Sequence, residues 1–579
     1  MGDVELEENS YDAVIVGTGL GATLVSGALA REGKRVLHLD RREHYGAEVA
    51  SLHLDGLVHE LKEGSAGECP SFEDVELLDA AGLPPGHRSR DFSLDLTPRG
   101  VFAVSPLIDA LLHSGITSYV DFKIIRRAYI SLNEALHVVP SSKADIFQSQ
   151  ILGLMEKRKL GNFLQFCLPP NFLSPDASTR DVQQRRREKD VLRLPDQLVS
   201  ALRSYEGKSF ECFLEDRKLS PKLRGIVMHA IAGIREPQSG PGAVGAVEGA
   251  RRMMRYILSV HRYGPTPFIY PMYGVAEFPQ ALARFGAVNG ATFILNKAVA
   301  DRELGEDGSL RAIVLDGGTR IRTRSLISTR HDLPASILPP ARTAAAAPRH
   351  RVARCICIVP RTVAPPPPGE EGSADEATSE VYVTLPPGAH GNVNAVSVLQ
   401  LSSGMGVTPR GLFAVHFTTV PAPGVSARDA LSGAVAFLLG DLAKSPPGEA
   451  SASSGEPTTP SSGESPAAST PAAQQAGKPP ILWGCYFTHN YTDQQPADGL
   501  LPHNVHVLST AVVGHNDNGF GCCIEEAREI FQTLCGKHAD FLADTKLKQF
   551  ESNSWNWWEG EWDGNWWQEW NRPYWDMRY

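Results

Sequence analysis

Residues 12–23 read Asp-Ala-Val-Ile-Val-Gly-Thr-Gly-Leu-Gly-Ala-Thr, and this stretch decides the fold of the chain. Its first five residues have the length of a buried strand, and the glycines that follow predict a tight turn. An apolar pattern through Leu24 and Leu29 predicts a helix that ends at Gly33, and residues 36–39 predict a second strand. Strand, glycine turn, helix and strand in this order predict the βαβ unit of a Rossmann-type fold.

The turn also carries the residue pattern of a dinucleotide site. Gly17, Gly19 and Ala22 fit the pattern G-x-G-x-x-G/A, and Asp40 follows about where an acid that binds a ribose is expected. Glycines in such a turn let a pyrophosphate approach the backbone N–H groups at a helix N-terminus. The pattern indicates the fold more strongly than it indicates a bound cofactor.

The residues after the second strand argue against a flavin. Flavin amine-oxidase-like proteins typically continue with two glycines and an arginine, whereas residues 41–48 read Arg-Arg-Glu-His-Tyr-Gly-Ala-Glu. Ala47 and Glu48 replace the second glycine and the arginine, and a carboxylate beside a pyrophosphate is unfavourable. The late strand before Ser509 also lacks the Gly-Asp pair that flavoproteins direct at the ribityl chain. We therefore expect a flavin-type fold without FAD.

Composition restricts the classes of function. The 579 residues are 42% hydrophobic, enough for two or three domains with a sizeable core. A formal net charge of −10 argues against a general nucleic-acid binder. The apolar runs fall short of the roughly 18 to 20 residues of a membrane span, and the N-terminus lacks a secretory pattern. We expect a cytosolic protein that meets lipid through a pocket or a partner.

The reactive residues do not form a catalytic or metal pattern. The nine cysteines have neither zinc-ribbon spacing nor the density of a disulfide framework, so we expect reduced thiols. Cys355 and Cys357 lie in an apolar run that predicts a buried strand. Neither a Ser-His-Asp arrangement nor a nucleophile elbow is evident, so we expect no catalytic residues.

Beyond the opening unit the chain alternates in character. Ser142 and Asp145 form a plausible capping box before a helical region. Apolar residues then recur at helical spacing: Phe147, Ile151, Leu154, Met155, Leu160, Phe163, Leu164 and Phe166. Residues 221–233 and 524–535 also predict helices, and 481–487 and 503–508 predict strands.

These patterns predict an α/β, flavoprotein-like domain with several sheets and an inserted smaller all-helical domain. The expected divisions are 1–106 (dinucleotide-type domain, first part), 107–235 (helical domain), 236–340 (second part), 341–545 (remainder) and 546–579 (acidic tail). Low-complexity insertions at about 364–380 and 445–480 predict disordered loops. Eight of the nine tryptophans lie in the tail, to which we assign no role.

One long block carries a resemblance to a known family. Residues 262–284 read Arg-Tyr-Gly-Pro-Thr-Pro-Phe-Ile-Tyr-Pro-Met-Tyr-Gly-Val-Ala-Glu-Phe-Pro-Gln-Ala-Leu-Ala-Arg. Together with residues 11–46, this block resembles the family shared by Rab escort proteins and Rab GDP dissociation inhibitors, the choroideremia protein family. Residues 156–167, 226–232, 481–483 and 514–518 resemble the escort branch, component A of Rab geranylgeranyltransferase.

The resemblance implies a set of binding residues. Its Rab-binding platform matches Tyr45, Glu277, Arg284, Thr292 and Ile294, and a neighbouring mobile loop matches Arg262, Thr266 and Phe268. Phe163 and Phe166 lie near the helix that faces the transferase in the family, where ordinary core packing explains Phe163 equally well. Tyrosine and arginine are common anchors of interfaces, and charges orient a partner.

The resemblance implies a function without catalysis. An escort protein binds GDP-bound Rab, presents its tail to the geranylgeranyltransferase heterodimer, shelters the geranylgeranyl groups and delivers the product to membrane. One alternative is a GDP dissociation inhibitor that recycles prenylated Rab. A second, from another class, is a flavin-dependent oxidoreductase, which Glu48 disfavours.

Overall fold

The computed structural model describes most of the chain. The described residues are 10–66, 70–78, 83, 86–168, 194–235, 243–333, 336, 349–364, 379–441, 477–492, 501–510 and 520–542. The tryptophan-rich tail, the motif at 514–518 and most of both predicted insertions lie outside them.

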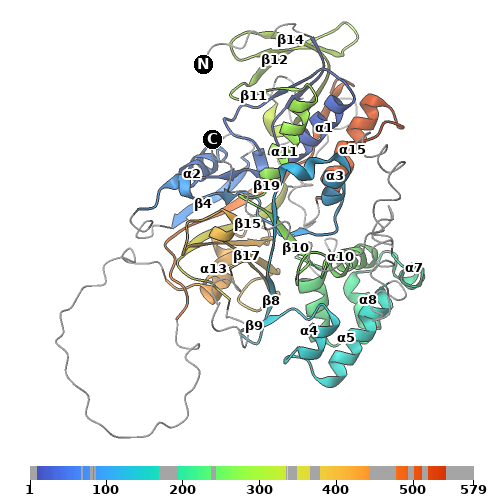
Figure 1. The fold of residues 1–579 in the computed structure, drawn as a ribbon, viewed down its shortest axis with the longest axis vertical. Coiled ribbons are helices and arrows are strands. Elements are labelled where there is room, and N and C mark those ends of the chain that lie inside the picture. Colours follow the sequence, from blue (N-terminus) through green and yellow to red (C-terminus); the bar gives the residue numbers. More distant parts are fainter. Residues whose placement is uncertain are drawn as a thin grey trace, which may run out of the picture.

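A Rossmann-type sheet forms one end of the molecule (Figure 1). Its parallel strands are, in spatial order, β11 (Thr292–Ile294), β2 (Val36–Leu39), β1 (Ser10–Val16), β14 (Arg320–Thr329) and β20 (Val505–Leu508). An antiparallel pair, β13 (Leu310–Leu315) and β12 (Val299–Leu304), extends the sheet beside β14. The prediction of an opening βαβ unit is confirmed, because β1 and β2 flank α1 (Leu20–Arg31).

Three helices cover one face of this sheet. α1 packs against α11 (Glu277–Val288) and α15 (Gly521–Cys535). α1 has buried residues on every side, including Leu20, Leu24 and Leu29, because it lies between the sheet and its two neighbours. The predicted strand at 503–508 and helix at 524–535 are confirmed as β20 and α15.

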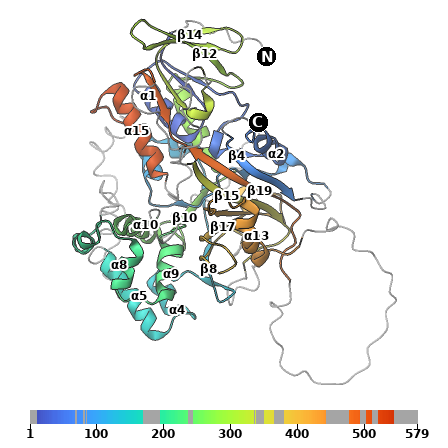
Figure 2. The same cartoon turned by 180° about the vertical axis from the view of Figure 1, so that it is seen from behind.

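A larger sheet lies beside the first (Figure 2). Its eight strands are, in order, β4 (Phe72–Leu78), β19 (Trp483–Thr492), β15 (Arg349–Val359), β18 (Phe413–Thr419), β17 (Val396–Ser402), β16 (Val381–Leu385), β8 (Arg127–Leu132) and β9 (Ala135–Val138). α13 (Ala427–Leu438) packs on β15, β18 and β19. The predicted strands around Cys355 and 481–487 are confirmed as β15 and β19.

The helical region begins later than the sequence predicts. Residues 122–138 form β7 (Phe122–Ile124), β8 and β9 instead of helices, and β8 pairs with β16 from a distant part of the chain. β7 joins a three-stranded sheet with β6 (Val101–Phe102) and β10 (Phe268–Pro271). The predicted helical domain included these residues. Local periodicity does not reveal that a strand pairs with a distant part of the chain.

The helices of the helical region gather at the end of the molecule opposite the Rossmann-type sheet (Figure 1). They are α4 (Lys143–Gln148), α5 (Leu154–Cys167), α7 (Asp196–Leu202), α8 (Phe210–Asp216), α9 (Pro221–Gly225), the π-helical turn η5 (Ile226–Ile231) and α10 (Ala246–Ser259). The capping box is confirmed: Ser142 N–H donates to Asp145 Oδ2 at 3.0 Å, and Asp145 N–H donates to Ser142 Oγ at 3.1 Å. Within the described residues, no helix combines the length and the apolar character needed to cross a bilayer.

Two helical glycines provide a matched test of this packing. A Cβ added to Gly249 in α10 would lie 2.6 Å from Cβ of Phe210 in α8, whereas one added to Gly161 in α5 meets nothing within 4 Å. Gly249→Ala should therefore lower the free energy of unfolding by about 1–3 kcal/mol through overpacking. Gly161→Ala should raise it by about 0.5–1 kcal/mol. Urea unfolding of both variants checks the prediction, and a stabilised Gly249→Ala would contradict it.

Candidate functional site

The glycine turn lies where three parallel strands end. It follows β1, Asp40 follows β2, and Asp332 lies three residues beyond β14. Gly17 has a φ of +92°, which favours glycine. Asp40 is buried, and its Oδ2 accepts hydrogen bonds from the backbone N–H (2.7 Å) and Oγ1 (2.6 Å) of Thr18. Thr18 Oγ1 also accepts from Gly46 N–H at 3.1 Å, so the turn fixes the loop that carries Tyr45.

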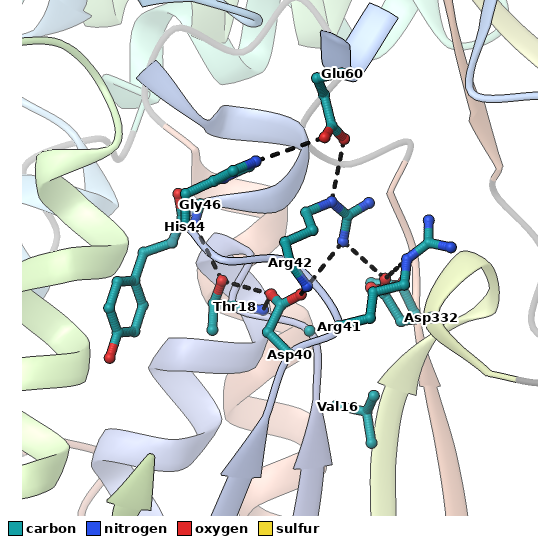
Figure 3. Close-up of polar contacts among 12 residues, drawn as sticks. Val16, Thr18, Asp40, Arg41, Arg42, His44, Gly46, Glu60 and Asp332 are labelled. Carbon is teal, nitrogen blue, oxygen red and sulfur yellow. Dashed lines mark hydrogen bonds and ion pairs between the residues drawn. The ribbon is translucent and has the colours of Figure 1, made fainter. Parts of the chain in front are cut away.

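Arg42 joins three carboxylates at this edge of the sheet (Figure 3). Its Nη1 lies 2.9 Å from Asp332 Oδ1 and 3.6 Å from Asp40 Oδ1, and its Nε lies 3.1 Å from Glu60 Oε1. His44 Nε2 lies 3.5 Å from the other oxygen of Glu60. We call Asp40, Arg42, Glu60 and Asp332 the Arg42 cluster. It ties the ends of β2 and β14 to α2 (Leu54–Glu63).

The Arg42 cluster shifts the pKa of its acids in opposite directions. Burial and the charge of Asp332 raise the pKa of Asp40. Burial alone would raise the pKa of Glu60, but hydrogen bonds and charge from His44 and Arg42 lower it to about 2. Burial also opposes ionisation of Asp332, and Arg42 outweighs it, so the pKa of Asp332 is lowered. One guanidinium is therefore shared by three carboxyl groups and offsets part of their negative charge, as a low-dielectric site requires.

The turn does not fit a dinucleotide. A Cβ at Gly19 would lie 2.6 and 2.7 Å from the two carboxyl oxygens of Glu48, and one at Gly17 would meet Asp332 Oδ2. Carboxyl groups thus lie against both glycines of the motif. Asp40, predicted as a ribose-binding acid in a vestigial turn, directs its oxygens at Thr18 and Arg42 instead. These are contacts within the protein, and they make Asp40 a structural member of the turn in this conformation.

Three of the predicted platform residues lie together at the edge strand β11. The ring of Tyr45 is 6.4 Å from that of Phe293, which stacks on His38 at 4.7 Å. Phe293 separates Thr292, which is exposed, from Ile294, which is half-buried. Tyr45 is also half-buried, and burial together with the charge of Asp40 raises its pKa. Tyr45 therefore presents a neutral phenol beside β11.

The two charged platform residues lie on α11. Glu277 is its first residue, and Arg284 follows two turns later on the exposed side. The guanidinium of Arg284 lies 4.7 Å from the centre of the Tyr119 ring. Burial and the charge of Asp121 raise the pKa of Glu277. Because α11 leads into the parallel strand β11, its N-terminus lies at the edge where the strands end.

The structure separates the predicted loop residues from this group. Phe268 is buried in β10, where its ring lies 5.1 Å from Phe102 and 4.5 Å from Tyr382. Thr266 is buried too, and its hydroxyl donates to the carbonyl of Ile125. Neither side chain presents a surface to a partner in this conformation. Only Arg262 of the three is partly exposed.

The two predicted transferase-binding residues also differ from each other. Phe163 is buried, 6.3 Å from the Phe213 ring, as core packing would place it. Phe166 is half-buried, with the Arg217 guanidinium 4.2 Å from its ring centre.

The exposed apolar surface of the helical region lies elsewhere. Phe147, Leu154 and Met155 are 66%, 83% and 64% exposed, on α4 and the first turn of α5. We call these three side chains the α4–α5 patch. The sequence pattern placed them in a helix with the buried Leu160 and Phe163, because periodicity alone did not show the break between the two helices. Large apolar side chains exposed to this degree on adjacent helices are candidates for an interaction site.

Comparison with known proteins identifies the family of the chain. The family described as "GDP dissociation inhibitor" matches residues 6–423, which include the glycine turn, the Arg42 cluster and both α11 and β11. The chain belongs to the GDP dissociation inhibitor family.

Curated relatives carry two kinds of name. The chain is 30% identical over 338 residues to "Rab proteins geranylgeranyltransferase component A" of Drosophila melanogaster (56% of this chain, 60% of that protein). It is 27% identical over 465 residues to "Rab escort protein 1" of Arabidopsis thaliana (72% and 77%). It is 28% identical over 298 residues to the "Rab GDP-dissociation inhibitor" of Saccharomyces cerevisiae (51% and 58%). The chain thus spans about 60% of the length of the fly and yeast proteins.

A solved structure of this family has the same fold. The Rab GDI of Plasmodium falciparum superimposes with a TM-score of 0.59 at 21% identity, covering 92% of this chain and 99% of that one. The predicted fold class, a Rossmann-type α/β architecture with several sheets and a helical part, is confirmed.

Removal of the central cation of the Arg42 cluster should be strongly destabilising. Arg42→Met leaves Asp332, Glu60 and buried Asp40 without their guanidinium, so the free energy of unfolding should fall by about 3–5 kcal/mol at neutral pH. The exposed neighbour Arg41, which lies 3.7 Å from Asp332, is the control, and Arg41→Met should cost about 1 kcal/mol or less. Equal effects of the two substitutions in urea unfolding would contradict the role of Arg42.

The same cluster predicts an acid dependence. The pKa of Glu60 is 4.5 ordinarily and about 2 in the folded chain, so its stabilisation is complete above pH 4.5. That stabilisation is lost as the pH falls from 4.5 through 2. Arg42→Met should flatten this part of the curve of stability against pH, and an unchanged slope would contradict it.

Proposed function

We propose that this protein is a Rab escort protein. It binds newly made GDP-bound Rab GTPases, presents them to Rab geranylgeranyltransferase and delivers the prenylated product to membranes. It is an accessory protein without catalysis of its own, it works in the cytosol without FAD, and it does not bind nucleic acid. The observation that supports Rab binding is the family match across residues 6–423, which includes the turn, cluster and edge strand that position Tyr45. The escort role rests on the longer match to an escort protein.

The surface at the edge of the Rossmann-type sheet supports a protein partner. Arg284 and Thr292 are exposed, and Tyr45, Glu277 and Ile294 are half-buried, so each side chain has surface to offer. The surface combines an aromatic ring, a cation, an acid and an aliphatic group, and such groups serve as anchors and orient a partner by charge. Preference for GDP-bound Rab would follow from unequal contacts with the Rab segments that change with the nucleotide.

The α4–α5 patch supports a second contact, with the transferase or with the isoprenoid. Burial of a twenty-carbon chain at about 0.8 kcal/mol per carbon supplies on the order of 10 kcal/mol before entropy costs. Transfer of exposed Leu154 and Met155 from water into such an interface would be favourable for the same reason. Phe166 lies at the other end of α5, with its ring beneath the Arg217 guanidinium, and is separate from this patch.

The lengths of the alignments favour the escort role over the inhibitor role. The match to the Arabidopsis escort protein extends over 465 residues, whereas that to the yeast inhibitor extends over 298. The inhibitor remains the second candidate, because a Schizosaccharomyces pombe inhibitor is 29% identical over 302 residues, close to the identity of the fly escort relative.

Charge reversal on α11 should weaken Rab binding. Arg284→Glu changes an exposed cation of the proposed platform, and we expect affinity for GDP-bound Rab to fall at least tenfold, or about 1.4 kcal/mol. Arg324→Glu is the matched control, because Arg324 is 84% exposed on β14 near the beginning of the parallel strands. Fluorescence titration with a GDP-loaded Rab measures both. Equal affinity of Arg284→Glu and the unsubstituted protein would contradict the platform.

Reconstitution tests the escort function itself. The full chain, a GDP-loaded Rab, Rab geranylgeranyltransferase and labelled geranylgeranyl diphosphate should give labelled Rab only when this protein is present. Leu154→Asp should reduce that yield at least fivefold while Rab affinity is unchanged. Val393→Asp, which alters an apolar side chain that is 70% exposed outside the helical region, should have no effect.

The outcomes separate the two candidates. If a folded protein supports no labelling of several Rabs yet extracts prenylated Rab from membranes, it is an inhibitor. If it neither supports labelling nor binds any Rab, both candidates are excluded.

A further inference from the structure

We propose that the side chain of Glu48 is an internal occupant of the glycine turn, which keeps an anion-binding backbone closed to phosphates. The turn retains the parts of an anion site: Gly17 and Gly19 follow a buried strand, and Gly19 is the N-cap of the twelve-residue α1. The first turn of α1 contains no acid, and the side chain of Gly19 cannot cap it. The N–H groups there therefore favour an anion from another part of the chain.

Glu48 is held against this turn by its backbone. Gly46 N–H donates to the carbonyl oxygen of Thr18 at 3.2 Å, and Thr97 Oγ1 donates to the carbonyl oxygen of Glu48 at 2.6 Å. Gly46 has a φ of +111°, and a Cβ there would lie 2.8 Å from Cα of Ala50. The conformation of this loop thus requires glycine at position 46 and directs the side chain of Glu48 toward Gly19. A Cβ added at Gly19 would lie 2.6 Å from the Glu48 carboxyl group.

The surroundings of Glu48 oppose a phosphate by contact and by charge. Asp332 and Asp40 are near enough to raise its pKa in addition to burial, while Arg42 lowers it. Cys523 of α15 is near enough that the charge of Glu48 adds to the burial that raises the pKa of that thiol. A pyrophosphate would have to displace the carboxyl group and then face the remaining acids of the Arg42 cluster.

In a dinucleotide-binding fold the glycine turn usually both begins a helix and binds the ligand, and in this arrangement it does only the first. The backbone of the turn is retained because it begins α1 and receives Asp40, while the ligand position is filled from within the chain. The chain therefore keeps the turn as a structural element that positions Tyr45 through Thr18 and Gly46.

Shortening residue 48 should reopen the turn. The probe is inorganic pyrophosphate, added to the full chain at constant ionic strength and followed by thermal unfolding and isothermal titration calorimetry. Glu48→Ala should gain saturable binding with a rise in Tm, and Glu48→Ser should behave in the same way. The unsubstituted protein should not bind. Glu48→Gln should not bind either, because it fills the same space without the charge.

Glu63→Ala is the control, since it removes an exposed acid at the end of α2 and should leave binding absent. Pyrophosphate binding by the unsubstituted protein would overturn the proposal, as would its absence in folded Glu48→Ala and Glu48→Ser. Binding by Glu48→Gln as strong as by Glu48→Ala would also overturn it, because charge rather than occupancy would then close the turn.

Discussion

The rest of the structure depends on one guanidinium. Arg42 contacts Asp332 at 2.9 Å and Glu60 at 3.1 Å, and Asp40 lies 3.6 Å away, so acids from three separate parts of the chain share one cation whose side chain is 13% exposed. Without it their mutual repulsion and desolvation would oppose folding at this edge of the sheet. With it, the ends of β2 and β14 lie together, and Asp40 receives both hydrogen bonds from Thr18.

This electrostatic arrangement continues outward to the surface. The hydrogen bond from Gly46 N–H to Thr18 Oγ1 fixes the loop that carries Tyr45. The ring of Tyr45 therefore lies beside Phe293 of the edge strand. In dinucleotide-binding proteins the carboxyl ends of parallel strands receive a ligand. Here carboxyl groups of the chain itself lie against both glycines. In the function that we propose, the same edge instead offers side chains to a GTPase, which explains how a nucleotide-type fold can serve a protein partner.

The sequence predicted local features well and long-range partners poorly. β1, β2, α1 and the Ser142–Asp145 capping box follow from residues close together, and all are confirmed. Arg42 and Asp332 are 290 positions apart, so no spacing rule could join them, and the sequence placed Asp40 only in the vestigial turn. The one sequence signal for the Arg42 cluster was the pair of adjacent arginines, Arg41 and Arg42, after a buried strand. The resemblance supplied Tyr45 and Arg284, which have exposed surface, but also Thr266 and Phe268, whose side chains are buried. Periodicity could not show that Leu154 points outward, because that depends on where α4 ends.

The central claim is that the edge of the Rossmann-type sheet formed by the Tyr45 loop, α11 and β11 binds GDP-bound Rab. Hydrogen exchange followed by mass spectrometry, with and without a saturating GDP-loaded Rab, tests it most directly. The account predicts slower exchange in residues 41–50 and 277–294, and a smaller effect with the same Rab loaded with a GTP analogue. Unchanged exchange in both segments, with protection confined to other parts of a chain that demonstrably binds the Rab, would contradict it.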